Sequence, residues 1–510
     1  MSLRTHTALE AVEAFSPAEE RFNRRRRTAG LFLAPAIFII LLLAPLGDIP
    51  VLAHRMAAIM GLVVTLWLTE ALPLAVTAIL GPCLAVVLGI ASGRQALAPF
   101  ADPIIFLFIG GFMLAQAMFV HGVDRRIAYS ALAIRGVGTS AFRILLVYGA
   151  VCAVLSMWIS NTATTAMMFP IGLSIIAHLG RTATGQRVQV RSFALGLMLI
   201  TSFASSIGGM GTPVGTPPNL IGIGMLEKIV GSKIPFFSWM AIGVPVVVIL
   251  FGYLLLQFYW TSVRGLDVAE GSTALVHDEL KRLGPMTVGQ RNVLLAFGVT
   301  VALWITPGVL AILQMDQTWF ALRYARAMPE GVAAMFGAFL LFVLPVDWRE
   351  RRFTLSWDEA VKIDWGITLL YGGGLALGEM TFSTGLAQAL GEGITSWLPS
   401  QSTLALTMLF TGAAILVSEA ASNTASANMV IPIAIAVSQA AGIRAIEPVL
   451  GATLGASMGF MMPVSTAPNA IVYSSGFVPI GKMMRHGVML DLVAFVVIVT
   501  TVMVLGPRLF

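Results

Sequence analysis

Long runs of apolar residues recur along the whole chain, and short polar or charged segments separate them. A helix needs about 20 apolar residues to cross a bilayer, and by this measure about eleven runs are candidate transmembrane helices. They lie at residues 29–46, 55–72, 73–91, 102–122, 192–209, 237–260, 289–312, 330–346, 363–380, 447–464 and 484–506. The pattern predicts an all-α, polytopic membrane protein.

Two further apolar runs, 144–180 and 404–440, differ from ordinary spans. Arginines flank the first on both sides, which places both of its ends in the cytoplasm, so this segment must enter the membrane and return. The second has the same length and flanks poor in Lys and Arg, which predicts entry from the opposite face. Their polar midpoints, at Thr162 and Ser422, suit a turn at membrane depth, which is tolerated only inside protein or against a water-filled cavity. We expect two re-entrant hairpins.

An internal repeat links the two hairpins. Three pairs of segments match in the same order: Ile109–Met118 with Tyr371–Met380 and Ser160–Pro170 with Ser422–Pro432, both at an offset of 262 residues, and Pro213–Asn219 with Pro463–Asn469, at an offset of 250. Three ordered matches indicate an ancient duplication. Many membrane transporters consist of inverted repeats with this kind of internal symmetry.

The repeat divides the chain into four parts. They are a cytoplasmic N-terminal tail (1–28), a first inverted repeat (29–262), an inter-repeat linker (263–291) and a second inverted repeat (292–510). Each repeat contains one hairpin and one helix that a proline-containing loop interrupts, because proline cannot continue a helix. These interruptions are expected near 213–219 and near 463–469.

Composition agrees with a membrane protein, since 57% of the residues are hydrophobic and only 11% are charged. The net charge of +6 does not indicate nucleic-acid binding, because Arg24–Arg27 cluster directly before the first apolar run. Such a cluster sets topology and places the N-terminus in the cytoplasm. A signal peptide is the alternative, but the acidic tail and the lack of a small-residue cleavage site disfavour it. We expect a multi-pass protein of the cell inner (plasma) membrane.

The repeated motifs supply groups that bind ions. At a hairpin tip, the first N–H groups of the second arm are unsatisfied and form a positive dipole end, which suits a carboxylate. Ser and Thr hydroxyls and the Asn amide add donors, while Ser and Asn oxygens can face a cation. Interrupted helices expose carbonyl oxygens that can coordinate Na⁺. A plain helix cap and a proline kink are the simpler interpretations, but neither explains why both motifs occur twice.

The paired Ser-Asn-Thr motifs, the paired Pro-Asn loops and the segment Thr69–Thr77 (Thr-Glu-Ala-Leu-Pro-Leu-Ala-Val-Thr) resemble the divalent anion/sodium symporter family. This family includes bacterial dicarboxylate transporters and the mammalian sodium-coupled dicarboxylate and citrate transporters. The resemblance covers essentially all of the chain after the tail. It implies a homodimer in which each protomer has a scaffold domain and an elevator-type transport domain. The implied function is secondary active transport of C4-type dicarboxylates (the succinate, fumarate and malate class) coupled to sodium.

The same resemblance implies which residues form the site. The substrate carboxylates would lie between the tips, at Ser160, Asn161, Thr162, Ser422, Asn423 and Thr424, and Thr216 and Thr466 of the interrupted helices would complete the site. One sodium ion would be bound by Ser156, Ser160, Asn161 and Gly215. The other would be bound by Ser418, Ala421, Asn423 and Ser465, where the small residues lend backbone carbonyls.

The stretches that would build the site carry no positive charge. Lys and Arg are absent from 144–180, 192–226, 404–440 and 445–481. Burying an unpaired charge costs on the order of several kcal/mol, and helix ends offer only about half a charge each. A bound dicarboxylate therefore requires cations, and we expect at least two sodium ions per substrate.

Other functions stay open from the residues. A dicarboxylate or citrate exchanger that does not require sodium is the main alternative. A membrane enzyme would need a nucleophile–base pair, a carboxylate pair or a metal cluster tied to the repeats, and a passive channel would not need two broken-helix sites. Glu70, Glu379 and Glu419 lie in or beside apolar runs, where an ionisable group is a functional candidate by default. Each is either a coupling residue or a structural carboxylate, and Glu419 is the better candidate for proton coupling.

Overall fold

The computed structural model describes residues 17–510 except 46, 48, 183–186 and 267–273. Within this part of the chain, nine helices are long and apolar enough to cross a membrane, or ten if a bent pair counts as one span. Large apolar side chains cover the outside, and Phe32, Val87 and Trp397 are 75%, 78% and 89% exposed. An exterior of this kind suits lipid rather than water. The prediction of an all-α polytopic membrane protein is confirmed.

All secondary-structure elements described in the first half of the chain are helices. These are α1 (Pro17–Leu43), α2 (Val51–Thr69), α3 (Leu74–Val87), α4 (Gly93–Leu97), η1 (Ala98–Ala101), α5 (Pro103–His121), α6 (Val123–Leu132), η2 (Val137–Thr139), α7 (Ala141–Ser156), α8 (Asn161–Thr182), α9 (Arg187–Gly209), α10 (Pro217–Met225), η3 (Leu226–Val230), α11 (Phe236–Phe258) and η4 (Tyr259–Val263). The predicted tail to residue 28 is therefore helical from Pro17, and its first 16 residues lie outside the described part.

The linker and the second half contain the remaining elements. These are α12 (Ala274–Arg282), α13 (Val288–Ile312), α14 (Trp319–Ala327), α15 (Glu330–Val343), β1 (Pro345–Asp347), β2 (Arg352–Phe353), α16 (Trp357–Ala360), α17 (Trp365–Ser383), α18 (Leu386–Thr395), α19 (Thr403–Ala420), α20 (Asn423–Ala440), α21 (Ile446–Gly455), α22 (Ala467–Tyr473) and α23 (Ile480–Leu509). The two strands form one short antiparallel hairpin. Helix α13 begins inside the predicted linker, and part of that linker (267–273) is not described.

The expected number of spans, about eleven, was too high. The run at 447–464 is not one helix, because α21 ends at Gly455 after 10 residues. Helix α3 has only 14 residues, and α17 contains Gly372–Gly374 and Glu379, which lower its hydropathy. Two of the nine long apolar helices, at 161–180 and 403–420, are arms of the predicted hairpins. Hydropathy alone does not show where a helix ends inside an apolar run.

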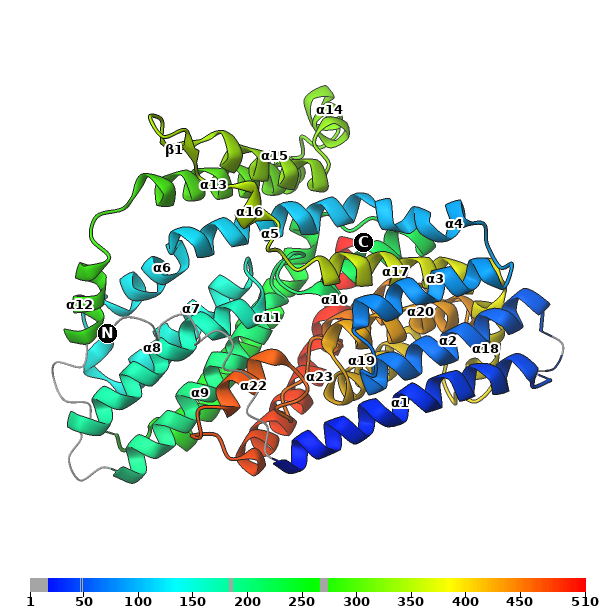
Figure 1. Ribbon diagram of the computed structural model, residues 1–510, viewed down its shortest axis with the longest axis horizontal. Coiled ribbons are helices and arrows are strands. Elements are labelled where there is room, and N and C mark those ends of the chain that lie inside the picture. Colours follow the sequence, from blue (N-terminus) through cyan, green and yellow to red (C-terminus); the bar gives the residue numbers. More distant parts are fainter. Residues whose placement is uncertain (1–16, 46, 48, 183–186, 267–273) are drawn as a thin grey trace.

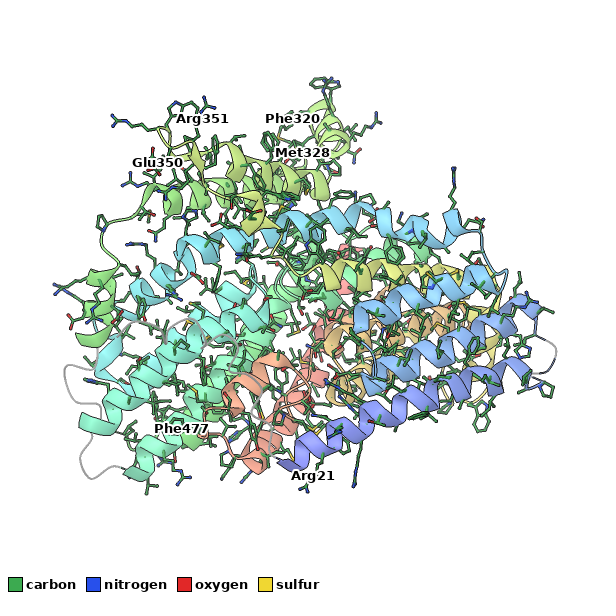
Figure 2. All side chains as sticks on the ribbon, in the orientation of Figure 1. Arg21, Phe320, Met328, Glu350, Arg351 and Phe477 are labelled. Atoms are coloured by element: carbon green, nitrogen blue, oxygen red, sulfur yellow. The ribbon has the colours of Figure 1, made fainter. Side chains whose placement is uncertain are left out.

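The helices form packed groups around the centre of the molecule (Figure 1). Helices α1, α2, α3 and α17 pack in sequence on one another, and α7 and α8 both pack on α9. An outer layer of α13 and α15 covers α5. Phe320, Met328, Glu350 and Arg351 mark the edge of this layer, far from the centre of the bundle (Figure 2).

The second segment of each interrupted helix packs against the other half of the chain. Helix α10, the second segment of the broken helix in the first half, packs on α20 and α21 of the second half. Helix α22, its counterpart, packs on α8 and α9 of the first half. Each short segment therefore contacts a hairpin arm and a broken helix of the other half.

Helix α5 packs on α15 through Gly110, where an added Cβ would lie 2.5 Å from the Ala334 carbonyl carbon. At the adjacent Gly111, the nearest atom to an added Cβ is Val214 Cγ1 at 3.6 Å, an ordinary contact. We predict that Gly110→Ala forces the helices apart and lowers the free energy of unfolding by roughly 1–3 kcal/mol, as overpacking does. Gly111→Ala is the matched control. Thermal unfolding of the purified protein in detergent measures both, and equal midpoints for the two variants would contradict the close contact.

Candidate functional site

The first tip is a short break between two helices. Helix α7 ends at Ser156, and α8 begins at Asn161. Ser160 caps α8, because its Oγ accepts a hydrogen bond from the Ala163 N–H at 3.2 Å. Ser156 Oγ donates to Asn161 Oδ1 at 2.7 Å across the break. The tip is therefore closed by a serine–asparagine pair, and the N-terminal end of a long helix starts there.

The second tip has the same construction between α19 and α20. Ser422 caps α20 by accepting a hydrogen bond from the Ala425 N–H at 3.2 Å. Ser418 Oγ donates to Asn423 Oδ1 at 2.8 Å. All of these residues follow their counterparts in the first tip by 262 positions, so the sequence match corresponds to matching hydrogen bonds.

The two helix interruptions are also alike. Between α9 and α10, Asn219 Nδ2 donates to the carbonyl oxygens of Gly209 (2.9 Å) and Thr212 (2.8 Å). Between α21 and α22, Asn469 Nδ2 donates to the carbonyl oxygens of Gly459 (2.9 Å) and Met462 (3.0 Å). The donor and both acceptors in the second half follow their counterparts in the first half by 250 residues. One buried asparagine in each half thus pairs with the carbonyl groups that the break removes from helical bonding.

Glycines bring the tips against the interruptions. An added Cβ at Gly209 would collide with Asn161 Oδ1, and one at Gly459 would lie 3.1 Å from Asn423 Oδ1. In the second half, Asn423 Nδ2 also donates to the Ser457 carbonyl oxygen at 3.3 Å. The prediction from sequence missed both glycines, although their offset of 250 residues extends the repeat.

The remaining expected site residues lie around these contacts. Thr162 is exposed, Thr424 and Thr466 are half-buried, and Thr216 is buried. Thr466 Oγ1 accepts a hydrogen bond from the Asn469 N–H at 3.3 Å, whereas the Thr216 side chain makes no such cap. Gly215 lies against the Gly209 carbonyl. Ala421 is buried directly before Ser422 in the second tip.

A single hydroxyl makes the two asparagine amides different. Ser202 Oγ of α9 donates to Asn469 Oδ1 at 2.6 Å. The corresponding position at the same offset is Ala452, which has no hydroxyl. Asn219 Oδ1 is buried and accepts no hydrogen bond from the described residues. The amide of Asn469 is thus fully paired, and that of Asn219 is paired only through its nitrogen.

Glu419 lies inside the second half of the site. Its carboxylate accepts hydrogen bonds from the N–H groups of Phe460 (2.5 Å) and Met461 (2.8 Å). Ser465 Oγ lies 2.8 Å from Glu419 Oε2 and 3.0 Å from the Glu419 carbonyl oxygen. The hydroxyl of Ser465, an expected sodium ligand, is therefore engaged with Glu419. Glu379, on α17, interacts electrostatically with Lys228.

A positive charge reaches the second tip from a distant part of the chain. Arg26 of α1 donates to the Ala420 carbonyl oxygen at 3.2 Å and to Glu70 Oε2 at 2.9 Å. Arg27 lies 3.5 Å from the same Glu70 oxygen. Glu70 is therefore an ion-paired carboxylate that joins α2 to α1. The four stretches named above lack Lys and Arg, and Arg26 is a cation from outside them that reaches the second tip.

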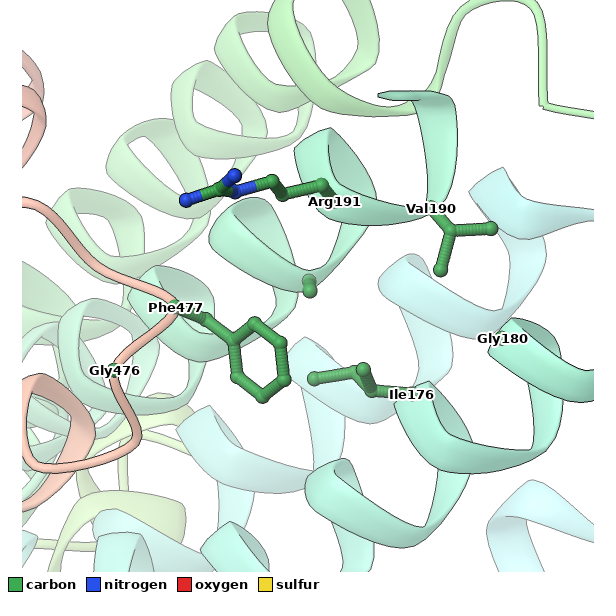
Figure 3. Close-up of a pocket in the computed structure, with 7 residues that line it drawn as sticks. Ile176, Gly180, Val190, Arg191, Gly476 and Phe477 are labelled. Carbon is green, nitrogen blue, oxygen red and sulfur yellow. The ribbon is translucent and has the colours of Figure 1, made fainter. Parts of the chain in front are cut away.

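A cavity of about 310 Å³ lies elsewhere, beside the far ends of α8 and α9 (Figure 3). It is lined by Ile176, Gly180, Val190, Arg191, Ala194, Gly476 and Phe477. Since a helix rises 1.5 Å per residue, Ile176 is roughly 22 Å along α8 from Asn161. None of the expected site residues lines this cavity, so it is not the candidate site.

Matched helix breaks inside a polytopic helical bundle, each with a capped helix end and an unwound segment, are typical of the class of secondary membrane transporters with discontinuous helices. The comparisons give the family. A family model described as "Sodium:sulfate symporter transmembrane region" matches residues 25–510. The chain belongs to this family, the divalent anion/sodium symporters, whose members are transporters and not enzymes.

Individual relatives support this assignment. The chain is 34% identical over 484 residues to the "Sodium-dependent dicarboxylate transporter SdcS" of Staphylococcus aureus (strain MSSA476), covering 94% of this chain and 91% of the relative. The protein of the same name from strain NCTC 8325 / PS 47 matches with the same identity and coverage. Among solved structures, the Alcanivorax borkumensis YdaH transporter is similar with a TM-score of 0.49 and 12% identity, over 83% of this chain and 88% of that one.

The Ser202–Asn469 contact has a measurable consequence. We predict that Ser202→Ala lowers the free energy of unfolding by roughly 1–3 kcal/mol, because it leaves the buried Asn469 Oδ1 without a donor. Ser205→Ala is the matched control, since the Ser205 hydroxyl bonds within the first half, to the Thr201 carbonyl oxygen at 2.7 Å and to the Cys152 thiol. Thermal unfolding in detergent measures the difference. If the unfolding midpoint of Ser205→Ala is as low as that of Ser202→Ala, the hydrogen bond between Ser202 and Asn469 stabilises the fold no more than a bond within one half.

Proposed function

We propose that this protein is a secondary active transporter that carries C4-type dicarboxylates, the succinate, fumarate and malate class, in symport with sodium. One observation carries the proposal: the serine–asparagine pair and the capped helix end occur at both tips, with nearly equal distances of 2.7 and 2.8 Å. Two like sites suit a ligand with two like charged ends. The relatives named above are called sodium-dependent dicarboxylate transporters.

The substrate would lie between the tips. One carboxylate would face the first tip and the other the second, each at the N-terminal end of a long helix, where N–H groups and the helix dipole favour negative charge. The proposed contacts are Ser160, Asn161, Thr162, Thr216, Ser422, Asn423, Thr424 and Thr466. The crossing of α10 and α22 supports this placement, because each threonine-bearing interruption packs against the other half.

Sodium ions would supply the missing charge. Two helix ends contribute about one positive charge together, which does not offset a dianion. The proposed ligands are Ser156, Ser160, Asn161 and Gly215 for one ion, and Ser418, Ala421, Asn423 and Ser465 for the other. The hydroxyl, amide and carbonyl oxygens of these residues are hard ligands, and unwound backbone is where transporters coordinate sodium.

The mechanism that we propose is movement of an elevator-type transport domain, which contains the two hairpins and both broken helices, against a scaffold. The protein would act as a homodimer in the inner (plasma) membrane, with its N-terminus in the cytoplasm and its two repeats inverted. The hydrogen bonds repeated at the two tips, and the packing of α10 and α22 on the opposite half, support movement of both sites together as one rigid body. Breaking either the hydrogen bonds or this packing would expose unsatisfied backbone groups to lipid.

An exchanger that does not require sodium is the second candidate, and the position of Arg26 favours it. Its guanidinium donates a hydrogen bond to the carbonyl oxygen of Ala420. Ala420 directly precedes Ala421, which is a proposed sodium ligand. A fixed positive charge there could replace part of the charge that a second sodium ion brings. Arg26 is also neutralised by Glu70 at 2.9 Å, and for this reason we place the symporter first.

The first functional test removes the tip asparagines. We predict that Asn161→Ala and Asn423→Ala each reduce succinate uptake by at least tenfold, because each loses a substrate donor, a cation ligand and the serine contact that closes its tip. Asn292→Ala is the control, since Asn292 bonds the Pro345 carbonyl and Thr354 in the outer layer and should retain normal uptake. Uptake in proteoliposomes at matched protein content measures this. Near-normal uptake by either tip variant removes that residue from the site.

The second test replaces sodium by choline. We predict that succinate uptake into proteoliposomes then falls to background, because the dicarboxylate has no other mobile counter-charge. Vesicles preloaded with unlabelled succinate form the second arm of the experiment. If labelled succinate enters these vesicles in choline at the sodium rate, the protein is an exchanger and the symport proposal is wrong.

A further inference from the structure

Asp102, at the beginning of α5, is a buried acid that three elements share. It caps α5, because its Oδ1 accepts a hydrogen bond from the Ile104 N–H at 2.9 Å. The hydroxyl of Tyr371 on α17 donates to the same oxygen at 3.2 Å. The other oxygen, Oδ2, accepts no hydrogen bond from the described residues, but the ammonium group of Lys228 on η3 lies 2.9 Å from it. One oxygen is thus bound by α5 and α17, and the other is paired with η3.

This ion pair joins two parts of the molecule that the proposed mechanism moves apart. Segment η3 directly continues α10, the second segment of the first broken helix, and therefore belongs to the proposed transport domain. Helices α5 and α17 contain neither a hairpin nor a broken helix, and they pack on α15 and α3. Both α10 and η3 contact α17, so the boundary between the two parts runs along α17.

One face of α17 forms this boundary. Tyr371, Gly374 and Gly378 are spaced three and four residues apart and therefore lie on the same side of the helix. An added Cβ at Gly374 would collide with Asn428 Oδ1 of α20, an amide oxygen that is buried and accepts no hydrogen bond from the described residues. An added Cβ at Gly378 would lie 3.5 Å from Ile229 Cδ1 of η3, an ordinary contact. These contacts are close but not hydrogen-bonded, so they do not fix one position of the helices along the boundary.

The ion pair does favour one position. The Asp102 side chain is only 2% exposed, whereas that of Lys228 is 42% exposed. If η3 moved along α17, the lysine would keep its access to water, but Asp102 would stay buried with Oδ2 unpaired. An unpaired buried charge is strongly unfavourable, so every position of η3 that separates the pair is disfavoured relative to the observed one.

We propose that the Lys228–Asp102 ion pair is a lock that holds α10 and η3 against α17 in the observed conformation, and that it opens in each transport cycle. The inference rests on the proposed moving transport domain and names a contact that restrains it. Helix α10 begins directly after Thr216, a proposed substrate contact. The lock and the candidate site therefore lie at the two ends of one short helical segment.

The test measures how often α10 leaves α17, from the rate at which a buried cysteine reacts with a water-soluble maleimide. Met225 of α10 is 1% exposed, and its Cε would lie 3.8 Å from an added Cβ at Gly378. Met225→Cys therefore reacts when α10 moves away from α17. The full-length protein carries Cys83→Ala as well, because Cys83 is exposed, and the buried Cys152 stays as an internal standard.

We expect Lys228→Met and Asp102→Asn each to raise this rate about fivefold, the effect on an equilibrium of losing one partly exposed ion pair. Asn still caps α5 and still accepts the Tyr371 hydroxyl. The double variant should react no faster than the single variants, because both changes remove the same interaction. Lys233→Met is the matched control and should leave the rate unchanged, since Lys233 is exposed and belongs to none of the ion pairs of the described residues.

Unchanged rates in Lys228→Met and Asp102→Asn overturn the inference, and so does a double variant in which the two effects multiply. An equal rise in the reaction of Cys152 also overturns it, because the variants would then loosen the whole fold.

A failure of the moving domain itself is detected separately. A disulfide between Ile229→Cys and Gly378→Cys would join η3 to α17, and full succinate uptake by the crosslinked protein would contradict the proposed movement. The maleimide rates would still decide whether the ion pair holds α10 against α17.

Discussion

The site depends on how unwound backbone is satisfied inside a membrane. Each interruption removes carbonyl groups from helical bonding, and lipid offers them no partner. One asparagine side chain in each half, Asn219 and Asn469, donates two hydrogen bonds to carbonyls at the start of and within the unwound segment. These bonds hold each unwound segment in one shape, and the glycines beside them meet the hairpin tips.

The two halves share their backbone arrangement and differ in their charges. The tips, caps and asparagine bonds repeat with the offsets of the sequence, while Met157 corresponds to Glu419 and Gly215 to Ser465. Only the second tip receives an arginine from α1, at the Ala420 carbonyl. The two halves therefore have the same hydrogen-bonded backbone arrangement in different electrostatic surroundings.

The sequence predicted the features that the repeat carries. The breaks before Asn161 and Asn423 and the unwound segments that Asn219 and Asn469 bond appear twice in the chain, so each copy supports the interpretation of the other. Arg26 could not be found in this way, because it comes from α1 and belongs to neither motif. The predicted number of spans differs from the structure for another reason. Helix α21 ends at Gly455 inside an apolar run, where hydropathy does not change.

The crossing of α10 and α22 makes the two halves depend on one another. Each short helix packs on a hairpin arm and a broken helix of the opposite half, and Ser202 of one half completes the hydrogen bonding of Asn469 in the other. One half on its own would leave its short helix without these neighbours and the Asn469 amide oxygen without its donor. Neither half can therefore keep its interruption in this shape alone, and a change that loosens one interruption should be felt at the other.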